Sequence, residues 1–227
     1  MQLLQIGPDL WRAVSAPIRL PGGARMPVAS TIVRLPDRTL AVYSPIAFAD
    51  ETAEELAGLG EVAHLIAPNL LHHLYLTAAS SRWPAATVHA PTGLVAKRPD
   101  LRVDRTLDAT CDPAWGGALD AVAIGGAPTL TETVLFHQPT GTLLCGDLVF
   151  NLPRPAKLAS RIVFSMMGVS GRLAQSRAWK MFAKDRSETR AARDRILAWP
   201  IRAVAPCHGD VIASDPATLA STLGRMG

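Results

Sequence analysis

Short apolar runs that end in polar or turn-forming residues constrain the fold of this chain more than any other feature. They lie at residues 10–14, 30–35, 40–43, 62–67 and 86–89, and at 119–124, 131–137, 142–144 and 202–205. Runs this short, bounded by glycine, proline, asparagine and aspartate, are typical of buried strands rather than helices. The grouping into an earlier and a later block predicts an α/β domain with two sheets.

Two local patterns predict how the first sheet is connected. Pro36, Asp37 and Arg38 supply turn chemistry between the runs 30–35 and 40–43, which predicts a hairpin. Asp50 or Thr52 is then expected to cap a short helix that places alanine and leucine side chains on one face. Because the run 62–67 follows that helix directly, we expect a strand, helix and strand unit with this face of the sheet covered.

The segment from residue 156 to residue 199 differs from the rest because it is rich in arginine and has a helical pattern. We interpret residues 153–198 as a helical insert in a single domain that spans residues 1–227. A chain of 227 residues is long enough to bury a core without disulfides. The apolar side chains around Met166 and Met167 predict the wall of a pocket, core packing or the face of a homodimer.

Charge and cysteine content exclude several classes of protein. The net charge is only +4, and the densest run of arginines is interleaved with acidic residues, so no nucleic-acid partner is expected. Cys111, Cys145 and Cys207 have no zinc-module spacing, and we expect Cys145 and Cys207 to be buried thiols rather than metal ligands. The sequence shows neither a secretory leader nor an apolar run long enough to span a bilayer, which predicts a cytoplasmic protein with no membrane contact.

Residues that could bind a metal ion gather where strands end. His72 and His73 follow the run 62–67, Asp147 follows 142–144, and His208 follows 202–205. Two or three imidazoles with one carboxylate suit a zinc or iron ion that keeps an open position for water. His72 and His73 could share one ion only in a helical start or a bent loop, since neighbours in a strand point to opposite sides. Hydrogen-bonded or surface histidines are the alternative interpretation of these residues.

Three segments together resemble the metallo-β-lactamase superfamily. Gly146 and Asp147 close an apolar strand as the family's metal-binding aspartate does, and His208 followed by Gly209 is similar to the family's last metal-binding histidine. The segment 62–75 is similar in position to the family's HxHxDH motif. This resemblance spans nearly the whole chain, and it implies a four-layer αββα sandwich.

The departures from the family pattern reduce the metal site that the resemblance implies. Alignment without gaps places Pro68 and Leu70 on the first two motif histidines, and Pro128 falls near the middle-motif histidine. The first metal position has therefore lost its three histidines. The remaining residues match the second position, so the resemblance implies either one zinc or iron ion or none, with the ligands His72, His73, Asp147 and His208.

The expected activity is hydrolysis of a small ester, thioester, amide or phosphoester whose identity the sequence leaves open. Asn69, Glu132 and Tyr75 are the candidates for catalytic help, and Glu132 is also a candidate replacement ligand. The alternative is a catalytically inactive member of the same fold that binds a small ligand or has a structural role. In either case a small molecule, and not a nucleic acid, is the expected partner.

Overall fold

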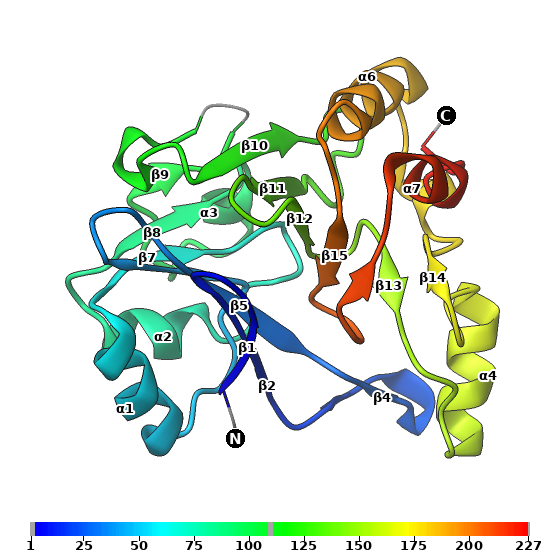
Figure 1. Cartoon of the computed structure of the whole chain (residues 1–227). Helices are drawn as coiled ribbons and strands as arrows, with labels where there is room; N and C mark the ends of the chain where they lie inside the picture. Colours follow the sequence, from blue (N-terminus) through cyan, green and yellow to red (C-terminus); the bar gives the residue numbers. More distant parts are fainter. Residues whose placement is uncertain (1–2, 109–110, 227) are drawn as a thin grey trace.

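Two β-sheets face each other across the middle of the molecule, and helices cover their outer faces (Figure 1). This arrangement is seen in a computed structural model, which describes residues 3–108 and 111–226. Each sheet is built from one half of the chain, so the point where the two sheets meet brings together segments that are distant in sequence.

The first sheet has seven strands, of which the last four are parallel. Its order is β1 (Leu3–Gly7), β2 (Leu10–Val14), β5 (Ala29–Arg34), β6 (Leu40–Tyr43), β7 (Val62–Ile66), β8 (Thr87–Ala90) and β9 (Arg105–Thr106). The outer face packs against α1 (Asp50–Leu59), α2 (Leu76–Arg82) and α3 (Leu94–Lys97). The hairpin of β5 and β6 and the parallel pair β6 and β7 around α1 confirm the two predicted connections.

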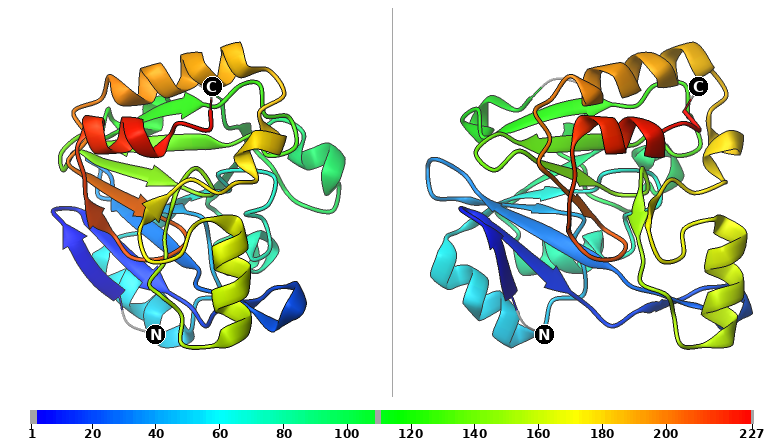
Figure 2. Two further views of the ribbon diagram at one scale, coloured as in Figure 1. Left: turned by 90° about the vertical axis from the view of Figure 1, so that its right-hand side faces the viewer. Right: turned by 45° about the vertical axis from the view of Figure 1, so that its right-hand side comes forward.

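The second sheet has five strands, and one parallel pair lies within it. Its order is β10 (Leu119–Ala123), β11 (Thr133–His137), β12 (Thr142–Cys145), β15 (Ala203–Pro206) and β16 (Ile212–Ala213). β12 and β15 are parallel, and every other neighbour in this sheet is antiparallel. Figure 2 shows α6 (Arg186–Leu197) and α7 (Pro216–Thr222) covering its outer face, where Ile196 and Leu219 join the core.

A continuous apolar core fills the space between the two sheets. Tyr43 and Ile66 enter it from the first sheet, and Leu144 and Ala205 enter it from the second. The next residue back along β7, Leu65, instead packs under the helices, as the alternation of side chains along a strand requires. Helices, sheet, sheet and helices are therefore stacked in four layers, which confirms the predicted αββα sandwich.

The structure differs from the expected elements in two places. The residue that precedes α1 is Ala49, because Asp50 already lies within the helix and Thr52 is buried, so neither caps it. The predicted helical insert contains α4 (Leu158–Met167), α5 (Trp179–Phe182) and α6, and it also contains a short strand, β14 (Leu173–Ala174), paired with β13 (Phe150–Asn151).

A small hairpin near the N-terminus lies beside the insert. It consists of β3 (Ile18–Arg19) and β4 (Arg25–Met26), and the backbone N–H of Arg25 donates to Ser160 in α4. Strands of two residues carry too little pattern to be predicted.

None of the described helices has the length and apolar character needed to cross a lipid bilayer.

Candidate metal centre

Three side chains converge where three strands end. His72 follows β7 of the first sheet, and Asp147 and His208 follow the parallel strands β12 and β15 of the second. The Nε2 atom of His72 lies 3.2 Å from one carboxylate oxygen of Asp147, and the Nε2 atom of His208 lies 3.4 Å from the other. Ligand atoms bound to one tetrahedral ion are about 3.3 Å apart when the bonds are near 2 Å. The three residues therefore form a ligand set at metal-binding spacing.

The far nitrogen of each ring is held by another part of the chain. The Nδ1–H of His208 donates to the carbonyl oxygen of Pro27 over 2.8 Å, and His72 Nδ1 lies 2.8 Å from the hydroxyl oxygen of Ser44. Because a carbonyl only accepts hydrogen bonds, the neutral His208 ring presents its lone pair at Nε2, toward Asp147. Phe150 stacks on the same ring, with centroids 5.2 Å apart. Metal-binding histidines are typically oriented by partners of this kind.

The two histidines keep Asp147 ionised. Burial alone raises the pKa of Asp147, but the charges and hydrogen bonds of His72 and His208 outweigh it and hold that pKa well below the usual carboxyl range. Burial correspondingly lowers the pKa of His208, and the hydrogen bond and charge of Asp147 reverse this effect and raise it. A carboxylate that stays charged beside two imidazoles attracts a cation to this position.

Glu132 lies behind Asp147 and supports the turn that carries it. Its carboxylate accepts the backbone N–H groups of Gly146, Asp147 and Leu148 at 2.8, 2.8 and 3.1 Å. The side chain is almost fully buried, and burial followed by the charge of Asp147 raises the pKa of Glu132 to about 7. Glu132 is not among the residues that converge on a metal position or line the adjoining cavity, so it positions Asp147 rather than acting as the expected replacement ligand or catalytic group.

Asn69 also has a positioning role. Its amide nitrogen donates to Asp147 at 3.0 Å and to Glu132 at 3.2 Å, and its oxygen accepts the backbone N–H groups of Leu71 and His72. These bonds shape the loop that presents His72. Asn69 is fully buried and does not line the cavity, so it has no direct access to a substrate there.

The turn at Gly146 is closely packed. A Cβ atom added at Gly146 would lie 2.8 Å from the Asn69 amide nitrogen, 3.3 Å from Pro68 Cγ and 3.5 Å from a Glu132 carboxylate oxygen. Pro68, which takes the place of the first motif histidine, therefore packs directly against the backbone of this turn.

His73 lies outside the group. Its Nδ1 atom is 3.0 Å from a guanidinium nitrogen of Arg98, so this neighbour of His72 faces a different part of the surface. Burial, together with the positive charges of Lys97 and Arg98, lowers the pKa of His73. Two cations beside the ring disfavour a bound metal ion, and the converging set is reduced from the expected four residues to three.

A cavity of about 280 Å³ opens beside the three ligands. Tyr75 is the one predicted catalytic residue that lines it. Most of the wall is apolar, and it is formed by Ile18, Leu20, Met26, Val28, Pro45, Ile46, Leu71, Leu74, Phe150 and Met167. The hairpin of β3 and β4, the loop after β7 and the end of α4 thus enclose the site. Met167 lines the cavity, as one of the sequence interpretations of that segment expected.

The two buried cysteines near the site remain thiols. Burial raises the pKa of Cys145 well above its usual value, and burial raises that of Cys207 to about 12. Neither belongs to the converging set. The expectation that they are buried thiols is consistent with these surroundings.

Three positions that sequence reasoning missed also shape the site. Ser44 directly follows β6, so the rule that found the other strand-end residues could have found it. Nothing in the sequence marks Pro27, whose contribution is a backbone carbonyl. Arg12 is buried and donates to the carbonyl oxygens of Pro206 and Gly209, on either side of His208. A long-range contact from β2 thereby holds the histidine loop.

Residues 22–165 match a family model described as a domain of unknown function (DUF4336). The chain belongs to this family. The matched span includes His72 and Asp147, whereas His208 lies beyond it. No curated protein matches the sequence.

Solved structures with the same fold include metallo-β-lactamases and a flavodiiron core. The DIM-1 metallo-β-lactamase superposes with a TM-score of 0.67 at 13% identity, over 99% of this chain and 95% of that one. A metallo-β-lactamase from Pontibacter korlensis gives 0.65 at 19% identity, over 99% and 98%. The metal-soaked Flv1 flavodiiron core from Synechocystis sp. PCC6803 gives 0.67 at 15% identity, over 99% and 60%. The DUF4336 chain therefore has the metallo-β-lactamase fold.

Proposed function

We propose that this protein is a metal-dependent hydrolase with a single zinc or iron ion bound by His72, Asp147 and His208. The observation that carries the proposal is the convergence of two Nε2 atoms on one ionised carboxylate, with each Nδ1 atom held by another group. Three protein ligands and one open position are typical of catalytic rather than structural metal sites. Such an ion would supply an activated water at neutral pH and polarise a carbonyl or phosphoryl oxygen.

The cavity supports a substrate with a substantial apolar group. Its wall is apolar on the side of the hairpin and α4, while Ser44, Tyr75 and the three ligands are its polar members. Leu71 and Leu74 remain half or more exposed at the loop that borders the cavity. Apolar pockets with a few convergent polar groups bind small molecules whose reacting bond is placed by the polar groups. An ester or thioester with an apolar acyl chain suits this lining better than a small charged phosphoester.

The remaining residues have separate roles in this proposal. Tyr75 lines the cavity with a phenol hydroxyl, which makes it the candidate proton donor to the leaving group. Asn69 and Glu132 act behind Asp147, which they hold toward the two histidines. Ser44 orients the ring of His72. The amide and the buried carboxylate are thus positioning residues.

A protein that binds an apolar ligand without turnover is the second candidate. The mostly apolar wall favours it, and so does the burial of Asn69 and Glu132 away from the cavity. The two candidates share the pocket and differ in chemistry. A protein that binds metal but leaves every ester intact would have the second function.

The test compares the metal content of variants at the two proposed histidine ligands with that of a variant at His73, the sequence neighbour of His72. Protein is purified without chelator, and its metal content is measured by inductively coupled plasma mass spectrometry for the wild type, His72→Ala, His208→Ala and His73→Ala. We expect His72→Ala and His208→Ala each to lose one equivalent of metal, while His73→Ala keeps it because its ring contacts Arg98. A folded His72→Ala variant with the same metal content as the wild type would overturn the assignment.

Activity is then measured on p-nitrophenyl esters and acyl thioesters of increasing chain length. We expect kcat/KM to rise with chain length and to fall at least about 100-fold in His208→Ala, as is usual when a catalytic group is removed. Tyr75→Phe should lower kcat with little change in KM if the phenol donates a proton. Equal rates for the wild type and His208→Ala would exclude the hydrolase and leave the binding role.

A further inference from the structure

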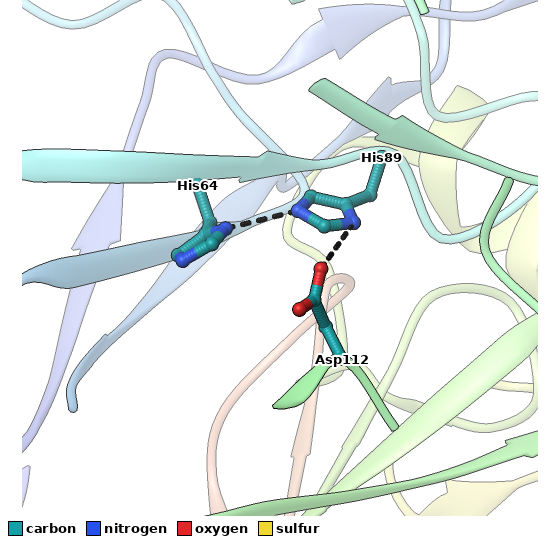
Figure 3. Close-up of side chains that lie close together, drawn as sticks. All are labelled: His64, His89 and Asp112. Carbon is teal, nitrogen blue, oxygen red and sulfur yellow. Dashed lines mark hydrogen bonds and ion pairs between the residues drawn. The ribbon is translucent and has the colours of Figure 1, made fainter. Parts of the chain in front are cut away.

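A second pair of histidines lies on two neighbouring strands of the first sheet, outside the candidate metal centre. His64 is on β7 and His89 is on the adjacent parallel strand β8. Ile66 pairs with His89 and belongs to the core between the sheets, so the same face of the sheet presents both histidines to the inter-sheet space. Figure 3 shows the two rings facing each other, with Asp112 approaching from a different segment.

The geometry of this cluster is close to that of a metal site. His64 Nδ1 and His89 Nε2 are 3.0 Å apart, and a carboxylate oxygen of Asp112 lies 3.9 Å from His89 Nδ1 (Figure 3). One ligand atom from each of the three residues lies within 4.8 Å of the others. The two distances involve different nitrogens of the His89 ring, and one ion takes only one of them. The rings and the carboxylate must therefore shift before all three ligand atoms reach the spacing of about 3.4 Å that tetrahedral bonds near 2.1 Å require.

The two rings are suited to bind as neutral ligands. Both are almost fully buried, and burial lowers the pKa of His64 and lowers that of His89 to about 4. Without an ion, one ring must donate its N–H to the lone pair of the other. An ion can replace that shared proton when the donor ring moves its proton to its other nitrogen, and both rings then remain neutral.

Asp112 can reach an ion because its other contacts are exchangeable. It belongs to the connection between β9 and β10, and it pairs at 2.7 Å with Arg105, whose side chain is more than half exposed. Its second oxygen accepts the N–H of Ala114 at the start of a short turn of helix. The contact of 3.9 Å with His89 is too long for a hydrogen bond. The carboxylate is thus held near the rings without being used by them.

A small cavity leads to the cluster. It has a volume of about 140 Å³, and His89, Asp112, Arg105 and Trp115 line it. Trp115 packs against His89 with ring centroids 5.6 Å apart, and its buried indole N–H has no hydrogen-bond partner among the described residues. A buried donor without a partner indicates an acceptor that is missing from the protein itself, and a metal-bound water in this cavity would be such an acceptor.

We propose that His64, His89 and Asp112 bind a second zinc ion, with a water from this cavity as the fourth ligand. The ion ties the connection that leads from the first sheet to the second onto the adjacent strands β7 and β8. None of the three residues lines the cavity of the candidate metal centre, so this site stands independently of the proposed hydrolase.

Metal stoichiometry tests the proposal. Protein loaded with zinc and freed of excess is analysed for the wild type, His64→Ala, Asp112→Asn, His72→Ala and the double variant His64→Ala with His72→Ala. We expect two ions in the wild type, one in each histidine variant and none in the double variant. The matched control is His137→Ala, another buried strand histidine, whose Nδ1 contacts Thr140 instead. It should keep both ions.

The outcomes separate the two sites. One ion in the wild type that His64→Ala removes and His72→Ala retains would support the second site and contradict the hydrolase proposal. Unchanged zinc content in folded His64→Ala and Asp112→Asn would overturn the inference. If His64→Ala does not fold, nitrogen-detected NMR of the histidine rings of the wild type during zinc titration tests whether His64 and His89 bind zinc. Rings of His64 and His89 that do not shift at zinc saturation would also overturn it.

Discussion

Glu132 is the residue whose charge state couples most directly to the geometry of the candidate site. Three backbone N–H groups of the turn that carries Asp147 donate to its carboxylate. Those bonds favour ionisation, whereas burial and the nearby charge of Asp147 oppose it, and the balance raises the pKa of Glu132 to about 7. The residue therefore titrates close to neutral pH, although a glutamate in an unfolded chain titrates near 4.3.

The stability of the metal-free protein should consequently depend on pH. A carboxyl whose pKa is higher in the folded state than in the unfolded state keeps its proton on folding between about pH 4.5 and pH 7. The unfolded state binds fewer protons there, so the free energy of unfolding falls as pH rises across that window. Urea unfolding in EDTA should show this fall for the wild type.

The variant Glu132→Gln removes that contribution. We expect its free energy of unfolding to lose the downward slope from Glu132 across the window, a difference of at most about 3 kcal/mol. Glu55→Gln, on the exposed face of α1, is the control and should keep the wild-type profile. The pKa of His208 is also raised, so its contribution to stability is lost as the ring deprotonates. The free energy of unfolding should therefore fall further at higher pH in all three proteins. Identical slopes for the wild type and Glu132→Gln would contradict the prediction.

At the scale of elements, the loop after β15 places His208 through a close approach of two backbones. Gly209 has a φ of +100°, and a Cβ atom there would lie 2.0 Å from the carbonyl oxygen of Asn151. The N–H of Asn151 in turn donates to the carbonyl of His208 at 3.1 Å. Only glycine permits both this conformation and this contact, so β13 and the histidine loop are positioned together.

Substitution at two glycines should have opposite effects. Gly209→Ala should lower the free energy of unfolding by about 1–3 kcal/mol from backbone strain alone, with a further loss from the overlap with Asn151. It should also weaken metal binding, because His208 is displaced. Gly58→Ala, in α1 with open space around the added Cβ, should raise the free energy of unfolding by about 0.5–1 kcal/mol. Urea denaturation measures both, and an unchanged midpoint for Gly209→Ala would refute the steric argument.

The positions where strands end could be predicted from the sequence. The runs ending before His72, Asp147 and His208 were predicted as strands, and the three residues converge because the ends of those strands meet. His64 and His89 were not singled out, although both lie in runs that were predicted as strands. A histidine inside an apolar strand carries no sign of its partner on the next strand, since strand register is decided by the whole sheet.

At the scale of the whole molecule, the candidate metal centre joins the two sheets. His72 belongs to the first sheet, and Asp147 and His208 belong to the second. His72, which helps to balance the charge of Asp147, reaches it only when this interface is formed, so metal binding and sheet packing should be coupled. The expected homodimer stays a prediction, and the exposed side chains of Met166 and Met181 mark the face to examine by sedimentation.

Metal binding should therefore raise the melting temperature of the folded chain. A free zinc concentration 100 times the dissociation constant stabilises a folded protein by about 2.7 kcal/mol per site, or roughly 5–10 °C for a domain of this length. Differential scanning calorimetry of EDTA-treated protein with and without zinc measures the shift. His72→Ala should show a smaller shift than the wild type, and His73→Ala should match the wild type. A zinc-independent melting temperature would show that the folded state binds zinc no better than the unfolded state.

Apolar periodicity and turn residues act locally, so the sequence predicted the two-sheet architecture and the strand ends without further information. The resemblance to the metallo-β-lactamase superfamily added the loss of the first metal position. Tertiary structure alone decided that His73 turns toward Arg98, that Glu132 lies behind Asp147, and that His64 faces His89. Side-chain direction in a bent loop and register between strands depend on contacts between distant segments. No local pattern records those contacts, so they exist only once the two sheets have packed.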